Sequence, residues 1–158
     1  MAVKKHVRLS FNVDEMFQTG IDRLKKVLEF RTGAGIEVTA VQGEKNGVTL
    51  AEGKAVIYYS KKHLFFRQLS VLVEHARHEA EFSLFEEVDF DSVSVMIDTS
   101  RCAVPTFLTI SRLLDYLAVM GYGMAMLYTE DTVKLENYEY FGYMRGRYTP
   151  DELRAMDD

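Results

Sequence analysis

The sequence is poor in several residue types, and each shortage excludes a class of protein. Its 158 residues include no tryptophan, two prolines and a single cysteine, Cys102. One cysteine cannot form an intrachain disulfide, which suits a reducing, cytoplasmic location. No apolar run reaches the roughly 18 residues of a membrane-spanning helix, and residues 1–11 lack the apolar core of a secretory signal. We therefore expect a cytoplasmic protein without a membrane segment.

A strongly basic composition is also lacking. The formal net charge is −5, and residues 88–158 contain 6 Lys and Arg against 12 Asp and Glu. Such an acidic half disfavours nucleic acid as a partner. It fits a site lined by carboxylates, and equally a surface whose charge keeps the protein in solution.

Histidine is absent from residues 88–158, so no histidine there could activate Cys102 as a nucleophile. We expect Cys102 to be a small buried side chain. His75 and His78 are spaced to share a metal on a helix, but no third ligand follows, so a solvated helix face is expected instead. The glycines form no phosphate-binding pattern. No metal and no cofactor are expected.

Residues 1–88 mix helical and strand-like patterns. Apolar residues at helical spacing predict helices over residues 16–31 and 61–78, and Gly33 and Gly35 are expected to end the first. On the second helix the predicted buried residues are Leu64, Phe65, Leu69, Leu72 and Ala76.

Strands in this half are expected to meet mainly in hairpins. Asn46-Gly47 is a strong hairpin signal and predicts that residues 36–42 pair with residues 48–52. Glu52-Gly53 predicts a second turn before a further strand. The remaining strands are predicted at residues 5–11, 54–60 and 81–88. We therefore expect an α+β domain whose sheet is largely antiparallel.

Residues 89–158 show a different pattern. Apolar runs at residues 93–97 and 124–127 are typical of parallel strands buried on both faces. A helix over residues 107–120 is predicted between them, with Pro105 at its start and Gly121 at its end. This order is a βαβ unit of an α/β structure. A capping box at residues 149–152 then announces a second helix, after which six residues remain.

Polar residues follow both predicted strands. Asp98 and Arg101 come after the first strand, and Glu130 and Asp131 come after the second. Because ligands bind outside the carboxyl ends of parallel strands, these four residues are candidates for substrate binding or for its support. We expect Arg101 to lie near Glu130 and Asp131, where it would either orient a polyhydroxylated substrate or form a structural ion pair.

Several motifs in this region follow the order of a known family. MIDTSR (96–101), VPTFLTISRLLDYLAVMGYGMAMLYTEDT (104–132) and YFGYMRGRYTPDEL (140–153) resemble the opening of the catalytic barrel of glycoside hydrolase family 20, the β-N-acetylhexosaminidases. Asp98, Ser100 and Arg101 match the family's Asp-x-Ser-Arg at the end of the first barrel strand. The likeness is to the bacterial branch. Residues 46–74 are similar to the non-catalytic domain that precedes this barrel.

The resemblance implies both a fold and an activity. Residues 1–88 would form a non-catalytic α+β accessory domain, and residues 89–158 would form an incomplete α/β segment, the first two βα units of a TIM barrel. The parent enzyme would be a retaining exo-β-N-acetylhexosaminidase that removes terminal N-acetylglucosamine or N-acetylgalactosamine. In this family the acetamido oxygen of the sugar attacks the anomeric carbon, an aspartate orients the acetamide, and a neighbouring glutamate protonates the leaving oxygen.

The family's catalytic Asp-Glu pair follows the fourth barrel strand, so this chain is expected to contain no catalytic residue. Glu130-Asp131 follows the second strand and takes only a supporting or substrate-facing role. The chain is therefore expected to be an inactive N-terminal fragment whose parent binds an N-acetylhexosamine-containing glycan. Open strand edges and an uncovered apolar face would also favour a homodimer.

Two other interpretations stay open. The chain could be a complete, non-catalytic binding or assembly module, or a small flavodoxin-like binding protein, although hairpins in the first half disfavour the latter. A loop rich in aromatic residues adds a further choice, because its rings could stack on sugars or pack against a barrel. Its aromatic residues are Tyr138, Tyr140, Phe141, Tyr143 and Tyr148.

Overall fold

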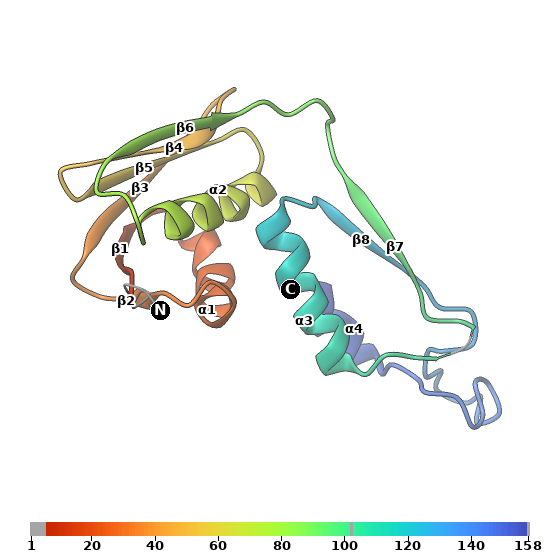
Figure 1. Ribbon diagram of the computed structural model, residues 1–158. Helices are drawn as coiled ribbons and strands as arrows, with labels where there is room; N and C mark the ends of the chain where they lie inside the picture. The colour runs from red at the N-terminus through yellow and green to blue at the C-terminus, as the bar shows by residue number, and fades with distance from the viewer. Residues whose placement is uncertain (1–5, 102, 158) are drawn as a thin grey trace.

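The computed structural model describes residues 6–101 and 103–157. The first residue of the strand predicted over residues 5–11 and the predicted burial of Cys102 therefore lie outside the described residues. Figure 1 shows two regions, a six-stranded sheet covered by two helices and a two-stranded sheet with two further helices. We call residues 6–88 the first region and residues 89–157 the second region.

The large sheet of the first region is mixed, with strand order β2-β1-β3-β5-β4-β6. Strand β1 is parallel to β2 and β3, and β3 is parallel to β5, whereas β4 is antiparallel to β5 and β6. The expectation of a largely antiparallel sheet was therefore wrong. The strands are β1 (Arg8–Asn12), β2 (Arg31–Thr32), β3 (Ile36–Gln42), β4 (Asn46–Ala51), β5 (Lys54–Tyr59) and β6 (Phe82–Glu86).

The hairpin predicted at Asn46-Gly47 is not formed, because both residues lie inside β4 and β5 separates β4 from β3. The Asn46 side-chain oxygen instead accepts hydrogen bonds from Ser60 N (2.8 Å) and Ser60 Oγ (3.0 Å). At Gly47 an added Cβ would lie 2.4 Å from a ring carbon of Phe85, so glycine permits a close approach of β6. The predicted turn at Glu52-Gly53 is confirmed, with positive φ angles of 50° and 74°.

Two helices cover one face of this sheet (Figure 1), α1 (Gln18–Val27), which follows a short 3-10 turn at Glu15–Phe17, and α2 (Lys62–His75). The five residues predicted to be buried on the second helix are all buried, four of them on α2 and the fifth, Ala76, directly after it. Helix α1 ends earlier than predicted. Glu29 adopts a positive φ of 53°, which turns Phe30 into the core before the chain continues as β2.

The core of the first region is aromatic at its centre. Phe17 and Phe65 are fully buried and stack with their ring centroids 4.0 Å apart. Tyr59 packs edge-on against both rings, with centroid distances of 5.4 and 5.9 Å. Burial of such large rings contributes about 1.5–3 kcal/mol for each side chain, so this cluster is a main source of stability.

The second region contains the predicted βαβ unit, in which β7 (Ser94–Asp98) pairs in parallel with β8 (Met124–Tyr128) and α3 (Phe107–Met120) connects them. Thr106, rather than Pro105, caps α3, since its Oγ1 accepts from Thr109 N. Gly121 ends the helix in the left-handed conformation, with φ 88°. Helix α4 (Pro150–Asp157) begins with the predicted capping box.

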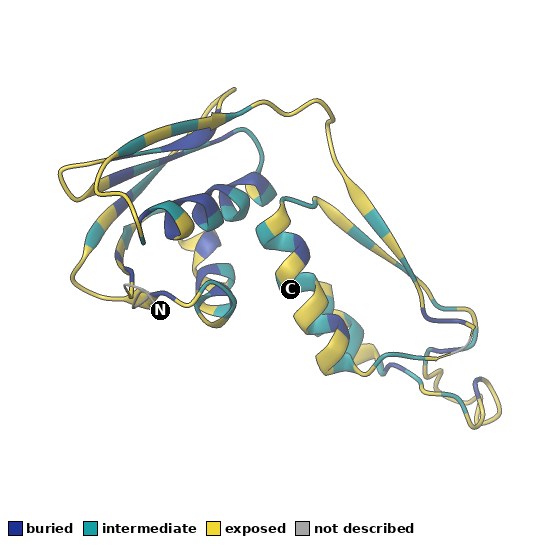
Figure 2. Cartoon of the chain, in the orientation of Figure 1, coloured by how far each residue is buried: buried dark blue, intermediate teal, exposed yellow. Residues whose placement is uncertain are grey.

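One face of the β7–β8 sheet is open, as the yellow stretches in Figure 2 show. Met96, Met124, Met126 and Tyr128 are between 42% and 64% exposed. The prediction that these strands are buried on both faces was therefore wrong for the described residues, in which β7 and β8 pair only with each other. The apolar sequence of these strands is that of a buried sheet, but even the residues of the other face, Val95, Ile97, Ala125 and Leu127, are only half-buried.

Helix α3 joins the two regions. In Figure 1 it lies between helices α1 and α2 on one side and the β7–β8 sheet on the other. Arg23 of α1 donates to Asp115 Oδ1 (2.9 Å) and Ser111 Oγ (2.8 Å) of α3, and Ser70 of α2 donates to Val119 O (3.0 Å). None of the described helices is long and apolar enough to cross a membrane.

Candidate functional site

The candidate site is at the carboxyl ends of β7 and β8, where the register places Asp98 beside Tyr128. Asp98 turns the chain sharply after β7, because its Oδ1 accepts from Ser100 N (2.8 Å) and Ser100 Oγ (2.6 Å). These two hydrogen bonds, the one from the Ser100 hydroxyl first, hold the pKa of the Asp98 carboxyl below its ordinary value. Asp98 is therefore a fixed anion at the rim of the sheet.

Arg101 lies at this rim but has a different partner from the one predicted. Its Nε is 3.4 Å from Asp98 Oδ2, and its side chain is 77% exposed. Its ion-pair partner is therefore Asp98 of its own loop, and whether it also approaches Glu130 and Asp131 stays a prediction. The mostly exposed guanidinium keeps donors available to a ligand, since a guanidinium carries five N–H groups.

The loop after β8 presents the other two predicted residues. Tyr128 donates a hydrogen bond from its hydroxyl to Glu130 Oε1 (3.0 Å), and this bond raises the pKa of the Tyr128 phenol. Glu130 has a positive φ of 46°, a conformation that a non-glycine residue rarely adopts and that clusters at functional sites. Asp131 lies one residue further on, and its carboxylate is turned to an arginine from a distant segment.

That arginine is Arg145, which the sequence did not single out as a site residue. Its Nη1 lies 3.2 Å from Asp131 Oδ1, at ion-pair distance although the N–H is not aimed at that oxygen. Its Nη2 donates to Ser100 O and lies 3.4 Å from Arg101 O. Arg145 therefore connects the loop after β7 to the loop after β8. The available sequence signal was its place in the motif YFGYMRGRYTPDEL (140–153), which marks the segment but does not show that Arg145 reaches the rim.

Two buried threonines connect the loop after β7 to the loop after β8. Thr99 and Thr132 are fully buried, and their hydroxyl oxygens are 3.3 Å apart. Thr99 also donates from N to Tyr128 O (3.0 Å), and Thr132 Oγ1 donates to Thr129 O (2.5 Å). Every hydroxyl thus has a partner, as burial requires. The two loops are fixed relative to each other by hydrogen bonds rather than by apolar packing.

The resulting rim carries three carboxylates, from Asp98, Glu130 and Asp131, and two guanidinium groups. Carboxylates accept hydrogen bonds from hydroxyls, and guanidinium groups donate them with fixed geometry. This combination can orient a polyhydroxylated ligand. In the part of the chain that the structure describes, no group of three or more metal-ligating side chains is placed to hold an ion. His75 instead lies 2.6 Å from Glu79 on the surface of α2, whereas His78 is exposed.

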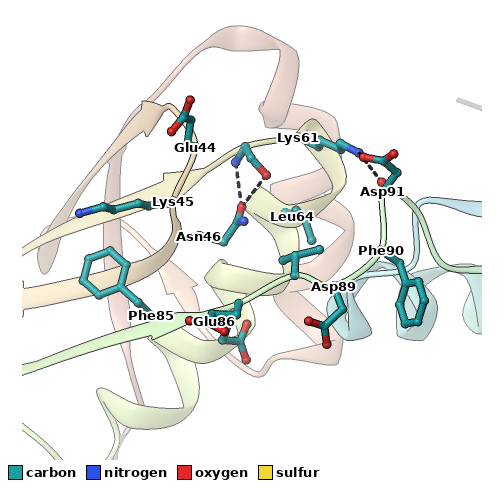
Figure 3. Close-up of a pocket in the computed structure, with 13 residues that line it drawn as sticks. Glu44, Lys45, Asn46, Lys61, Leu64, Phe85, Glu86, Asp89, Phe90 and Asp91 are labelled. Carbon is teal, nitrogen blue, oxygen red and sulfur yellow. Dashed lines mark hydrogen bonds and ion pairs between the residues drawn. The ribbon is translucent and has the colours of Figure 1, made fainter.

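A separate hollow of about 750 Å³ lies where the first region leads into β7 (Figure 3). Lys61 bridges its edge, with Nζ 3.1 Å from Asp91 Oδ1. Phe85 and Phe90 flank it, and several carboxylates line it, among them Glu86, which Arg67 and Gln68 hold by hydrogen bonds. The ion pair and hydrogen bonds described at this hollow join residues of the chain to one another. We therefore assign the hollow to the connection between the two regions rather than to the candidate site.

Comparison with known proteins shows which solved structures share this fold. No family profile and no curated protein sequence matches the chain. Among solved structures, the exo-β-N-acetylglucosaminidase of glycoside hydrolase family 20 from Vibrio harveyi matches 98% of this chain with a TM-score of 0.72 at 14% identity. The chain has the fold of part of that enzyme. The resemblance found in the sequence is therefore confirmed in three dimensions.

Two Streptomyces enzymes give the same result. A variant of the β-hexosaminidase of Streptomyces plicatus matches 98% of the chain (TM-score 0.70, 16% identity), as does the β-N-acetylhexosaminidase of Streptomyces coelicolor (TM-score 0.65, 15% identity). This chain covers 31% of the Vibrio harveyi protein and 39% of each Streptomyces protein. It therefore spans about a third of the length of the enzymes whose fold it shares.

Proposed function

We propose that this chain is the N-terminal portion of a retaining exo-β-N-acetylhexosaminidase of glycoside hydrolase family 20. The observation that carries the proposal is the match of 98% of the chain to about a third of such enzymes. In this proposal residues 1–88 are the accessory α+β domain, and residues 89–158 are the first two βα units of the catalytic barrel. The open edges of β7 and β8 are then the places where further barrel strands pair.

The site residues take supporting roles in this proposal. Arg101 donates to hydroxyls of the terminal N-acetylhexosamine, and Asp98 orients Arg101. Glu130 and Asp131 face the substrate from the second loop. The Asp-Glu pair that would orient the acetamide and protonate the leaving oxygen belongs to polypeptide beyond the second unit. Because Glu130-Asp131 follows the second strand and is assigned only a supporting role, the isolated chain is proposed to bind sugar weakly and to hydrolyse nothing.

The first test compares the chain with a longer product of the same gene. We expect purified residues 1–158 to give no turnover of a chromogenic β-N-acetylglucosaminide, whereas a protein extended through a whole barrel hydrolyses it. Turnover by residues 1–158 alone would contradict the assignment of the catalytic groups. A gene that encodes no further strands would instead favour the non-catalytic binding or assembly module.

A second test addresses the rim in the extended protein. Asp131→Asn removes one charge from the pair with Arg145 and is expected to raise KM about tenfold, equivalent to about 1.4 kcal/mol, with a smaller change in kcat. Asp151→Asn is the matched control, because Asp151 is almost fully exposed and pairs with Arg154 at the surface. Equal kinetics of the two variants would remove Asp131 from the substrate site.

The open apolar face also bears on assembly. We propose that, when residues 1–158 are prepared alone, a second copy covers this face and the molecule dimerises. Light scattering at high concentration is expected to give the mass of a dimer. A monomeric mass would contradict this part of the proposal and leave the enzymatic assignment unaffected.

A further inference from the structure

The loop that follows β8 is closed at its base. Val133 forms a bridge with Tyr148, Lys134 N donates to Tyr148 O (2.8 Å), and Tyr148 N donates to Thr132 O (2.9 Å). The Tyr148 ring is buried, and its hydroxyl donates to Pro105 O (2.6 Å). A compact surface loop whose ends meet is an Ω-loop, a type that is frequently functional.

The interior of this loop is held by its own backbone. Phe141 N donates to Tyr138 O and Tyr143 N donates to Tyr140 O, both at 3.1 Å. Arg147 Nη1 also donates to Phe141 O at 2.8 Å. The loop therefore presents its side chains from a fixed scaffold, which lowers the entropy that a ligand must overcome on binding.

The side chains presented are aromatic and face solvent. Tyr138, Tyr140 and Tyr143 are 66%, 83% and 64% exposed, and the rings of Tyr140 and Tyr143 lie 6.1 Å apart. A hollow of about 490 Å³ is lined by Asn137, Tyr138, Glu139, Tyr140 and Phe141. Aromatic walls with a few polar groups are the usual composition of a small-molecule site. We call residues 137–143 the aromatic loop.

We propose that the aromatic loop is a carbohydrate-binding subsite that holds β-linked N-acetylhexosamine units of an oligosaccharide beyond the terminal residue. This inference rests on the proposed function for the class of sugar. Tyrosine offers a large rigid face at low entropic cost, and a sugar ring presents C–H groups that pack on such a face. Asn137 and Glu139 lie beside the rings and can bond to the hydroxyls at the rim of the sugar.

Charge distinguishes this ligand from a single-stranded nucleic acid, which would also stack on aromatic rings. Nucleic-acid sites combine stacking with a basic groove. Here the hollow contains Glu139 and no basic side chain, and Arg147 is engaged with the loop's own carbonyl groups. The neutral, hydroxyl-rich surface of an oligosaccharide fits this environment better than a phosphate backbone does.

The aromatic loop is also physically connected to the candidate site. Arg145 lies two residues after the loop, 3.2 Å from Asp131 Oδ1, and donates to Ser100 O. Figure 1 shows the loop beyond the carboxyl ends of β7 and β8, and ligands of parallel sheets bind outside these ends. A chain of sugars bound at the rim could therefore continue onto the aromatic loop.

The test is an NMR titration of residues 1–158 with chitotriose, and with the N-acetylglucosamine monomer for comparison. We expect chitotriose to shift the resonances of Tyr138 and Tyr140 and to bind at least tenfold more tightly than the monomer. The double substitution Tyr138→Ala with Tyr140→Ala is expected to weaken chitotriose binding at least tenfold. Tyr140→Phe keeps the ring and is expected to retain binding.

Tyr116→Ala is the matched control, because Tyr116 is a half-exposed tyrosine on α3 away from this loop, and it is expected to leave binding unchanged. Because the substituted side chains are exposed, each variant is expected to keep the fold, and an unchanged amide spectrum would verify this. Absence of chitotriose binding, equal weakening by Tyr116→Ala, or preferential binding of a single-stranded DNA octamer would each overturn the inference. Hydrolysis by the extended enzyme would still support the proposed function in those cases, so the two failures can be told apart.

Discussion

Phe65 in the first region and Met126 in the second are both large apolar residues on regular elements, yet their surroundings differ. Phe65 is fully buried among other rings, whereas Met126 is 50% exposed on the open face of its sheet. The continuous apolar core consists of residues from the first region, from Val7 to Ala76 with Phe82 and Leu84 packed against it. The first region therefore supplies most of the stability, and the second depends on contacts that α3 makes with it.

Core truncation should show this difference most strongly. Phe65→Ala is expected to lower the free energy of unfolding by about 3–5 kcal/mol, because it leaves a cavity within the aromatic cluster. Ile110→Ala removes a buried residue of α3 that lies outside the continuous apolar core, and it is expected to cost about 2 kcal/mol, at the low end for such a truncation. Urea denaturation followed by circular dichroism measures both. Equal losses would contradict the assignment of stability to the first region.

A glycine pair tests how tightly the large sheet is packed. Gly47→Ala is expected to cost about 1–3 kcal/mol, since the new methyl group would overlap the Phe85 ring and the Leu84 carbonyl oxygen. Gly43→Ala is the control, because nothing lies within 4 Å of the added atom, and it should change stability by less than about 0.5 kcal/mol. Melting temperatures compare the two. A harmless Gly47→Ala would show that β4 and β6 are further apart than described.

The contact between the regions can be weakened on its own. Arg23→Ala removes the donors to Asp115 and Ser111 and is expected to cost about 1 kcal/mol, because the pair is partly exposed. Hydrogen exchange should quicken in α3 and remain slow in α2. Lys25→Ala is the control, since Lys25 pairs within α1 with Asp22. Equal exchange of α3 in both variants would show that Arg23 does not hold the second region.

The smallest expected effect concerns the rim. The native pKa of Asp98 is below its ordinary value of 3.8, so its stabilising contribution is complete above pH 3.8 and is lost as the pH falls through the native pKa. Ser100→Ala is expected to raise the pKa of Asp98, as measured by carbon NMR of the carboxyl group. Ser94→Ala, at the other end of β7, should leave it unchanged. A native pKa at or above 3.8 would contradict the hydrogen bonds described.

The sequence predicted the elements better than it predicted their pairing. Helix α2, the βαβ unit and the capping box of α4 followed from local spacing of apolar and capping residues. The insertion of β5 between β3 and β4 did not, because strand order depends on contacts between distant residues. Asn46-Gly47 illustrates the limit. This dipeptide is typical of turns, but here the Asn46 side chain accepts a hydrogen bond from Ser60 N and Gly47 leaves room for the Phe85 ring.

For the candidate site, too, the sequence predicted the positions of residues better than their contacts. Asp98, Arg101, Glu130 and Asp131 do lie at the carboxyl ends of two parallel strands, as the general rule for such sheets predicted. Their partners could not be predicted in the same way. Arg145 reaches Ser100 O from a position 45 residues away in the sequence, and no periodicity encodes that contact. The exposure of the aromatic loop likewise required the structure.

The closed base of the Ω-loop between Val133 and Tyr148, which contains the aromatic loop, has a consequence for how this protein can vary among its relatives. Tyr148 is anchored to Thr132 on one side and to Pro105 on the other, so the chain enters and leaves the loop at fixed points. Residues inserted or deleted between those points would alter the loop without displacing β8 before it or α4 after it. Length changes during evolution should therefore accumulate here, and relatives with different glycan preferences should differ most in this segment.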